Sequence, residues 1–525
     1  MIGAAGTSSQ VSPSKNLTSK DDNETIALSG SAVLLASAFG NGLNYAFGIF
    51  LARTLGAEEF GIYALALTIF NMVTLTVVFG MDIGVIKFVS HHLVEGQHGK
   101  ARESLIAASS IAFGSGLLAA IGLAVLAHPI AVTLYDKPDL IQSLLCFSAA
   151  IPLATLTIVL ISTLQAYQIV RHTVVIKYVW EPIAKFFFAG VMLWAGFQLL
   201  GVLISIVLVF AVSAVLSLLA AYRVAFRGSG CRLVWNLQEA RTLLSFCFPL
   251  VISKMVGVVA PRSDILILGY WVNAQEVGIY LAAFQTAATM ALIVGAFDTS
   301  LGPIMSRAWS KQDRGRMRES FQAVSRLSIM AALPLFCCLI LFPSEILRVF
   351  GLEFTRGSAA LMVLAFGQVF NTATGSANTI LLMSGQSRLV MTNTVVMGVI
   401  LLVATATVIP FWGITGAAIA ASTTFILTNV IRVIQVWRLY QVQPYTWDLM
   451  KPITAAIVAA GIIFMLHMSA VSLPSPVLGL ALGMLYLLGL LLLGINQQDR
   501  LVFQSIFLRF RKPFGEGKIE VRGIR

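Results

Sequence analysis

Charged side chains interrupt long apolar stretches of this 525-residue chain, and they are the residues best placed to do chemistry. They are Asp82, Glu181, Lys185, Lys254, Arg262, Asp264, Asp298, Arg326 and Arg432. No catalytic residues are predicted among them. A charge in apolar surroundings is costly unless a partner or ligand compensates it. The first hypothesis is therefore a binding site for a charged ligand.

Lys254 and Arg262 are the strongest candidates for such a site. They are eight residues apart in one apolar segment, which places them within about 80° of each other around a helix. Pro261 between them should kink or open that helix. Asp264 projects roughly opposite Arg262, so these two do not pair within a straight helix. Two cations without a partner on their own helix favour an anion such as a diphosphate.

Glu181 and Lys185 are four residues apart, acid first, so they can pair on one helical face. That pair is either part of the site or purely structural. Amide side chains form two further candidate stripes: Gln368, Asn371, Gly375 and Asn378 in one segment, and Ser37, Asn41 and Asn44 in another. Amides suit a glycan, but they serve equally well as hydrogen bonds between packed helices.

The remaining charged residues lie closer to the ends of their apolar segments. These residues are Asp82, Asp298, Arg326 and Arg432. Snorkelling of their side chains to the membrane surface explains them more simply than substrate contact does. They are also candidates for a gate at the cytoplasmic ends of the segments. Asp82 and Asp298 occupy nearly equivalent places in two related segments, which favours a shared structural role. Arg53, where the first apolar segment ends, is a further candidate for substrate contact.

Composition defines the elements that must hold these residues. The chain is 58% hydrophobic and 11% charged, whereas a soluble domain carries about a quarter charged residues. Its apolar runs are too long for barrel strands, and in lipid only helices and closed barrels satisfy their backbone groups. The sequence therefore predicts an all-α polytopic membrane protein.

A window of about 20 residues per span predicts fourteen transmembrane helices. They are 27–52, 60–86, 104–127, 140–167, 174–195, 199–222, 243–271, 277–304, 321–343, 358–383, 389–411, 413–437, 450–469 and 476–495. The tails and the loops after even-numbered helices hold 26 of the 35 Lys and Arg residues. Both termini are therefore predicted to be cytoplasmic. This bias also accounts for most of the net charge of +12, which is no argument for nucleic acid binding.

A repeat divides the chain. "GAEEFGIY" at 56–63 returns as "NAQEVGIY" at 273–280, a separation of 217, and "KARES" at 100–104 returns as "RMRES" at 316–320. Helices 1 to 6 thus correspond to helices 7 to 12, as two bundles in parallel orientation. The octapeptides fall on the outer turns between helices 1 and 2 and between helices 7 and 8, where a duplicated structural hairpin explains them.

The predicted organisation follows from this repeat. It consists of a disordered cytoplasmic tail (1–26), a six-helix bundle (27–223), a cytoplasmic linker (224–242), a second six-helix bundle (243–440), helices 13 and 14 (441–495) and a basic cytoplasmic tail (496–525). The last tail contains "RLVFQSIFLRFRKPF" at 500–514. We interpret this stretch as an amphipathic helix on anionic lipid, and a disordered basic tail is the alternative.

No metal or cofactor is expected. The five cysteines lack metal-ligand spacing and are better explained as small buried residues, and His91, His92 and His98 crowd one polar loop that we interpret as solvated. "GQHGKA" at 96–101 lacks the spacing of a phosphate-binding loop. Energy would then come from a proton or sodium gradient or from the flux of substrate, and the sequence leaves that choice open.

Three stretches carry a family resemblance. "LARTLGAEEFGIYALALTIF" (51–70), "GMDIGVIKFVS" (80–90) and "PRSDILILGYWVNAQEVGIYLAA" (261–283) resemble polysaccharide-type flippases of the multidrug/oligosaccharidyl-lipid/polysaccharide (MOP) exporter superfamily. The resemblance extends from residue 27 to about 440. It implies a V-shaped double bundle that moves undecaprenyl-diphosphate-linked oligosaccharide across the bacterial inner membrane by alternating access. The implied partners are that substrate, membrane lipids and a glycan polymerase or export machinery.

Three other functions fit the sequence less well than this one. A multidrug or cation antiporter and a lipid II flippase belong to the same superfamily, but the antiporters usually have twelve helices, and "EEFGIY" follows "LARTLG" as in the polysaccharide type. A membrane-embedded glycan polymerase or ligase would need an outward-facing site. The short external loops carry no cluster of His, Asp or Glu for one. We therefore expect a transporter and not an enzyme.

Overall fold

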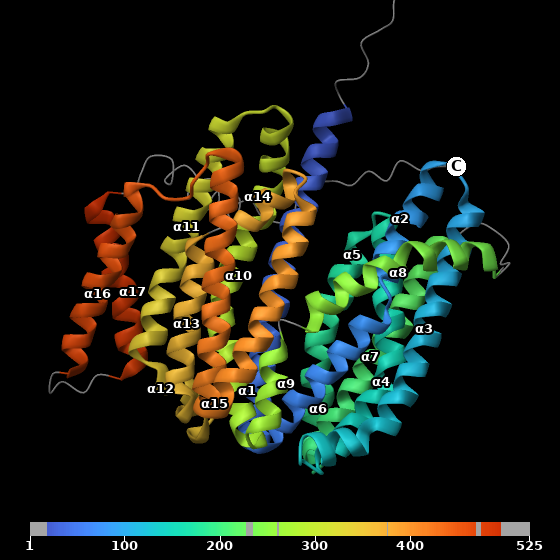
Figure 1. Ribbon diagram of the computed structural model, residues 1–525, viewed down its shortest axis with the longest axis horizontal. Helices are drawn as coiled ribbons and strands as arrows, with labels where there is room; N and C mark the ends of the chain where they lie inside the picture. The colour runs from blue at the N-terminus through green and yellow to red at the C-terminus, as the bar shows by residue number, and fades with distance from the viewer. Residues whose placement is uncertain (1–17, 227–234, 260–261, 375, 469–473, 495–525) are drawn as a thin grey trace, which may run out of the picture.

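The computed structural model describes residues 18–226, 235–259, 262–374, 376–468 and 474–494, and the regular elements in these ranges are all helical (Figure 1). The N-terminal half comprises α1 (Thr18–Val77), α2 (Met81–Val94), α3 (His98–His128), η1 (Pro129–Leu134), α4 (Leu140–Ala166), α5 (Val170–Thr173), η2 (Val174–Trp180), α6 (Glu181–Trp194) and α7 (Gln198–Ala225). The C-terminal half comprises α8 (Leu237–Val259), α9 (Ser263–Trp271), α10 (Ala274–Ser310), α11 (Arg314–Leu341), α12 (Pro343–Arg348), η4 (Leu352–Gly357), α13 (Ser358–Ala373), α14 (Ala377–Met383) and α15 (Ser387–Tyr440). Three elements follow: η5 (Trp447–Leu449), α16 (Met450–Met468) and α17 (Ser475–Leu493).

Two of the helices are hairpins. Gly56 has φ 79° inside α1, and Gly413 has φ 51° inside α15. Glycine occupies such left-handed positions without the steric cost that other residues meet. At each point the chain doubles back on itself, as Figure 1 shows at the lower ends of α1 and α15. The sequence predicts a turn at both places, and these predictions are confirmed.

Hydropathy identifies nine candidate membrane spans among the described residues, and two of them are the hairpin regions Ala36–Val94 and Ser387–Tyr440. The all-α polytopic fold class is thus confirmed, whereas the count of fourteen spans stays a prediction. Three predicted spans are not continuous helices. A turn with φ 51° at Phe79 separates α1 from α2, α8 and α9 divide predicted helix 7, and α13 and α14 divide predicted helix 10.

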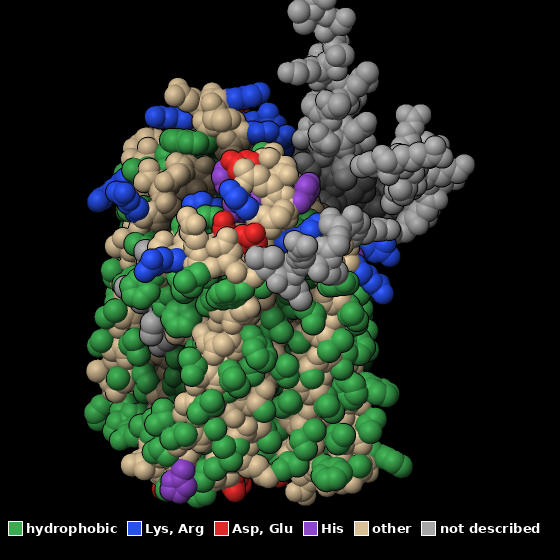
Figure 2. Space-filling model, turned by 90° about the vertical axis from the view of Figure 1, so that its right-hand side faces the viewer, with side chains coloured by type: hydrophobic (Ala, Val, Ile, Leu, Met, Phe, Trp, Pro, Cys, Tyr) green, Lys and Arg blue, Asp and Glu red, His purple; other side chains and the backbone are tan. Residues whose placement is uncertain are grey.

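Charge separates the two ends of the molecule. Lys and Arg gather at the end where α3 begins, and apolar side chains cover the body below it (Figure 2). We call this the basic end. The opposite end carries the turns at Gly56 and Gly413, and we call it the hairpin end. This separation agrees with the bias of basic residues that the sequence shows between alternate loops.

The two halves meet mainly where α1 packs against α10. Buried aromatic side chains fill the adjacent core, among them Phe60, Phe147 and Tyr280, each fully or almost fully enclosed. In contrast, α16 and α17 lie at one edge of the molecule and pack against α11 (Figure 1). The Tyr486 hydroxyl on α17 donates to the Met330 carbonyl oxygen on α11 at 2.8 Å, which fixes this pair to the C-terminal half.

Several predicted features lie outside the described residues. They are the N-terminal tail up to residue 17, most of the predicted linker (227–234), Pro261, Gly375 and the proposed amphipathic helix at 500–514. The predicted domain boundaries and the predicted cytoplasmic location of both tails remain predictions.

Orientation can be tested with single cysteines in a cysteine-free background. Gln97 and Asp313 lie at the basic end, and Asp136 and Arg356 lie at the hairpin end. If the basic end is cytoplasmic, a membrane-impermeant maleimide should label intact cells at 136 and 356 only, and permeabilisation should add 97 and 313. Labelling of position 97 or 313 in intact cells would reverse the orientation.

Candidate functional site

The N-terminal half brings two predicted candidates together. Lys185 Nζ on α6 donates to Asn44 Oδ1 on α1 at 3.1 Å, and the Asn44 amide donates to the Gly40 carbonyl oxygen at 2.9 Å. Lys185 interacts electrostatically with Glu181, four residues earlier, but the described residues show no ion pair between them within 4 Å. Asn41 is also exposed on this stretch of α1. The hydrogen bond to a neutral amide does not cancel the charge of Lys185, and the nearby Glu181 and Lys177 place charges of both signs around it.

The wide π-helical turn η2, directly before α6, positions these groups. It carries Lys177, which also interacts electrostatically with Glu181. π-Helical turns within helices occur frequently at functional sites because they re-aim the side chains that follow. Here η2 packs against α1, with Gly40 so close to the Tyr178 backbone that a β-carbon would lie 2.7 Å from its carbonyl oxygen.

In the C-terminal half, Arg262 immediately precedes α9 and its side chain is exposed. Its guanidinium carbon lies 5.2 Å from the centre of the Phe284 ring on α10, a cation–π contact. Such a contact leaves the N–H groups at the edge of the guanidinium able to bind an anion, and the same charge also interacts electrostatically with the buried Asp264. Lys254 lies on α8, but its side chain is outside the described residues.

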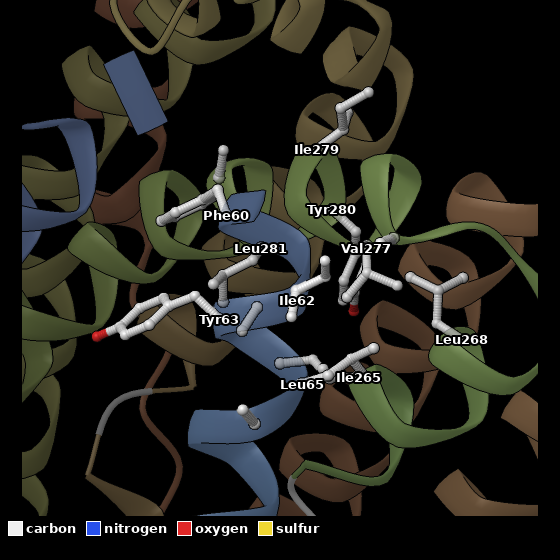
Figure 3. Close-up of a cluster of buried hydrophobic side chains, with 14 of the residues drawn as sticks. Phe60, Ile62, Tyr63, Leu65, Ile265, Leu268, Val277, Ile279, Tyr280 and Leu281 are labelled. Atoms are coloured by element: carbon white, nitrogen blue, oxygen red, sulfur yellow. The ribbon is translucent and has the colours of Figure 1, made fainter. Parts of the chain in front are cut away.

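The sequence predicts that Asp264 lines the substrate cavity, but in the structure its side chain is buried. Its side chain is 2% exposed, and Oδ2 accepts a hydrogen bond from the Tyr280 hydroxyl at 2.6 Å while Oδ1 accepts from the Ile265 amide at 2.8 Å. Tyr280 itself lies in the apolar core with Ile265 and Val277 (Figure 3). Asp264 is therefore a buried residue that joins α9 to α10. Sequence reasoning missed Tyr280 because nothing local distinguishes it from the matching Tyr63.

The amides of predicted helix 10 form a chain between helices. Asn429 on α15 donates to Asn371 Oδ1 at 3.1 Å, and Asn371 donates to Gln368 Oε1 at 3.3 Å. Gln368 and Asn429 are 5% and 4% exposed, so these groups hold α13 against α15. Asn378 is not on the same stripe as predicted, because α13 ends at Ala373 and Asn378 belongs to α14.

Arg53 lies at the hairpin end, where its Nε donates to the Val349 carbonyl oxygen of the other half at 2.6 Å. Lys137, which sequence reasoning did not select, makes a similar link. Its Nζ donates to the carbonyl oxygens of Gly269 at 2.7 Å and Val272 at 2.9 Å, at the end of α9. Burial lowers the pKa of Lys137, and the neighbouring Asp136 acts in the opposite direction. Both cations thus bind backbone carbonyls across the two halves.

The four candidates near the ends of their segments are also placed. Asp82 is in the first turn of α2, and Asp298 on α10 interacts with Ser376 and Thr379 beside α14. Arg326 is 5% exposed within α11. Arg432 on α15 has a buried Nε without a hydrogen bond among the described residues. Burial of Arg326 means that snorkelling to the surface does not describe this residue, whereas Arg432 is partly exposed and its role stays a prediction.

No group of three or more His, Cys, Asp or Glu side chains that could hold a metal ion occurs among the described residues. The interpretation of the three loop histidines as solvated is wrong for His92, which is 7% exposed with its Nε2 3.7 Å from Glu239 Oε1 on α8. The histidine is buried because the beginning of α8 packs against α2.

Membrane-length helices in two related halves, which carry exposed cations and amides, are typical of a membrane transporter. The profile of one family, described as "Polysaccharide biosynthesis protein", matches residues 50–356. The match covers more than half of the chain, so this chain belongs to that family.

Two curated relatives are similar over much of their length. A probable low-salt glycan biosynthesis flippase, Agl15 of Haloferax volcanii, is 23% identical over 420 residues, which cover 77% of this chain and 82% of the relative. The succinoglycan biosynthesis transport protein ExoT of Rhizobium meliloti is 24% identical over 333 residues, covering 62% of this chain and 63% of the relative. Both are named as transporters and not as enzymes.

Solved structures share the fold. The lipid II flippase MurJ in an inward closed conformation superposes with a TM-score of 0.71 at 14% identity, covering 91% of this chain and 99% of its own. An inward-facing multidrug resistance MATE family transporter of the MOP superfamily gives a TM-score of 0.64 at 12% identity, covering 78% of this chain and 98% of its own. The resemblance to a MOP-type double bundle is thus confirmed at the level of fold.

The hydrogen bond between Tyr280 and Asp264 predicts a stability difference. Replacing Tyr280 with Phe should lower the free energy of unfolding by about 1–3 kcal/mol, because a buried carboxylate loses a donor. Tyr63→Phe is the matched control, since Tyr63 lies at the equivalent repeat position and its hydroxyl makes no hydrogen bond to a described residue. Thermal melting in detergent would measure both, and equal losses would contradict a specific role for the pair.

Proposed function

We propose that this protein is a flippase that moves polyprenyl-diphosphate-linked oligosaccharide across a cell membrane for the synthesis of surface polysaccharide. The observation that carries the proposal is the family match over residues 50–356, supported by two relatives named for glycan flipping and succinoglycan transport. The substrate is expected to be an undecaprenyl-diphosphate-linked oligosaccharide, as the sequence resemblance implies. Alternating access between the two halves is the proposed mechanism.

The multidrug antiporter alternative is less well supported. The MATE structure covers 78% of this chain, whereas the lipid II flippase covers 91%. The larger share of this chain that the lipid II flippase covers is consistent with α16 and α17 being features shared with flippases. These helices pack on α11 at the edge of the molecule and leave the two repeated halves unaltered.

The charged groups suggest how the substrate is held. Arg262, with its exposed guanidinium braced by Phe284, is proposed to bind the diphosphate together with Lys254. Lys185 and Asn44 are proposed to bind the anion or the first sugar from the N-terminal half. We place the basic end in the cytoplasm, with both termini there, and the protein in the bacterial inner membrane. An association with a glycan polymerase or export machinery is part of the same proposal.

Loss of the protein should identify its step. A deletion strain should lose surface polysaccharide while the lipid-linked oligosaccharide accumulates in the inner leaflet, because the unit is made there and cannot cross. Leaflet-specific labelling of the lipid-linked sugar measures this directly. Units that reach the outer leaflet but remain unpolymerised would instead indicate a polymerase or ligase.

Substitutions at the two cations test the proposed diphosphate site. Lys254→Ala and Arg262→Ala should each reduce transport by about a hundredfold or more at normal protein levels, because the bound anion would lose a counter-charge when the substrate is enclosed between the halves. Lys254→Arg should retain partial activity, since the charge survives in a different geometry.

The structural alternative makes a different prediction. If each cation instead neutralises an acid on another helix, the alanine variants should misfold, and neutralising that acid (Glu181 or Asp298, for example) should restore abundance and activity together. Wild-type transport by well-expressed Lys254→Ala or Arg262→Ala protein would exclude that residue from the site.

A further inference from the structure

The repeated octapeptides contact each other across the two halves. Ala57 and Gly61 of the first copy correspond to Ala274 and Gly278 of the second, each pair 217 residues apart. A β-carbon on Gly61 would overlap the Ala274 carbonyl oxygen and lie 2.9 Å from the Gly278 nitrogen. A β-carbon on Gly278 would overlap the Ala57 carbonyl oxygen and lie 3.0 Å from the Gly61 nitrogen. The contact is therefore reciprocal, and it joins backbone to backbone.

Each copy has the spacing of small residues that permits such a contact. Ala57 and Gly61 are four apart on α1, and Ala274 and Gly278 are four apart on α10, so each pair lies on one helical face. Small residues at this spacing let helices in membranes approach until their backbones touch. The duplication thus supplies both sides of one self-complementary crossing.

Apolar side chains surround the crossing and exclude water from it. Val277 is fully buried, and Ile62 and Leu281 are each at most 5% exposed (Figure 3). Polar links lie closer to the hairpin end, on groups that are exposed or half-buried. These are the bond from Arg53 to Val349, the bond from Lys137 to Gly269, and Glu353 Oε2, which lies 3.4 Å from both the Ala57 nitrogen and the Gln275 amide.

We propose that this crossing is the closed gate of the hairpin end, and that Gly61 and Gly278 set how firmly it closes. The inference rests on the proposed function, because a substrate moving between the two halves must leave through this end. Closure depends on the absence of a side chain at both positions. The polar links break at little cost, because water can replace each of their hydrogen bonds when the gate opens.

A methyl group at either glycine should therefore favour the open state. Gly61→Ala and Gly278→Ala leave each half intact and add an atom only where the halves meet. Gly42 on α1 and Gly295 on α10 supply matched controls, since a β-carbon there meets nothing within 4 Å. A cysteine at Val277, in a cysteine-free background, reports whether the crossing is open, because position 277 is fully buried in the closed state.

The experiment measures the rate at which a thiol reagent labels Val277→Cys in membranes. Gly61→Ala or Gly278→Ala should raise this rate about tenfold or more, which corresponds to about 1.4 kcal/mol in favour of opening, while Gly42→Ala and Gly295→Ala leave it unchanged. Transport should fall in the first two variants only. Unchanged labelling in both would overturn the proposal.

A second measurement tests the gate even if the glycine variants do not fold. Arg53→Cys and Val349→Cys place one thiol on each half at the hairpin end, and a short reducible cross-linker can join them. Joining should abolish the transport that the unjoined double variant retains, and reduction should restore it to that level. Transport by the joined protein would show that the halves do not separate here.

The labelling assay also separates this inference from the proposed function. If the gate responds to Gly61→Ala but the wild-type protein moves no lipid-linked oligosaccharide, the substrate assignment fails and the gate stands. If the wild-type protein transports that substrate and the labelling rates of all variants agree, the gate fails and the flippase stands.

Discussion

Two helices from the separate halves touch through their backbones at Gly61 and Gly278, and much of the described structure is arranged around that contact. Helices in lipid gain little from burying apolar surface against one another, so close packing must supply the attraction. Short side chains allow it here, and the large buried side chains stand beside the crossing and fill the remaining space.

Several charged residues bind partners that carry no net charge. Arg53 and Lys137 bind carbonyl oxygens at the ends of helices, where backbone acceptors have no helical partner. Asp264 binds a hydroxyl and an amide, and Lys185 binds a neutral amide. In each of these hydrogen bonds the charged group binds a dipole and not an opposite charge.

Much of the architecture could be predicted from the sequence because it depends on local properties. Apolar length located the helices, and the glycines at 56 and 413 marked the hairpins. The break at Phe79 could not be predicted, since a left-handed phenylalanine is held by its surroundings and not by its own preference. The hydrogen-bond partners of Arg53 and Asn371 could not be predicted from the sequence either. Their contacts join residues 296 and 58 positions apart, and sequence spacing carries no information about such pairs.

The bond between Asp264 and Tyr280 has a consequence for how the duplicated fold can be used. Tyr280 has its counterpart in Tyr63, but the counterpart of Asp264, 217 residues earlier, is the buried Phe47. A homodimer of one half would carry the acid twice, on both sides of its axis. When the two copies are joined in one chain, each copy can change independently. An acid can therefore stand at position 264 of the second half while a phenylalanine stands at position 47 of the first. The difference in charge between the two halves thus arises at equivalent positions of a duplicated scaffold, where Phe47 packs against Phe186 and Asp264 binds Tyr280.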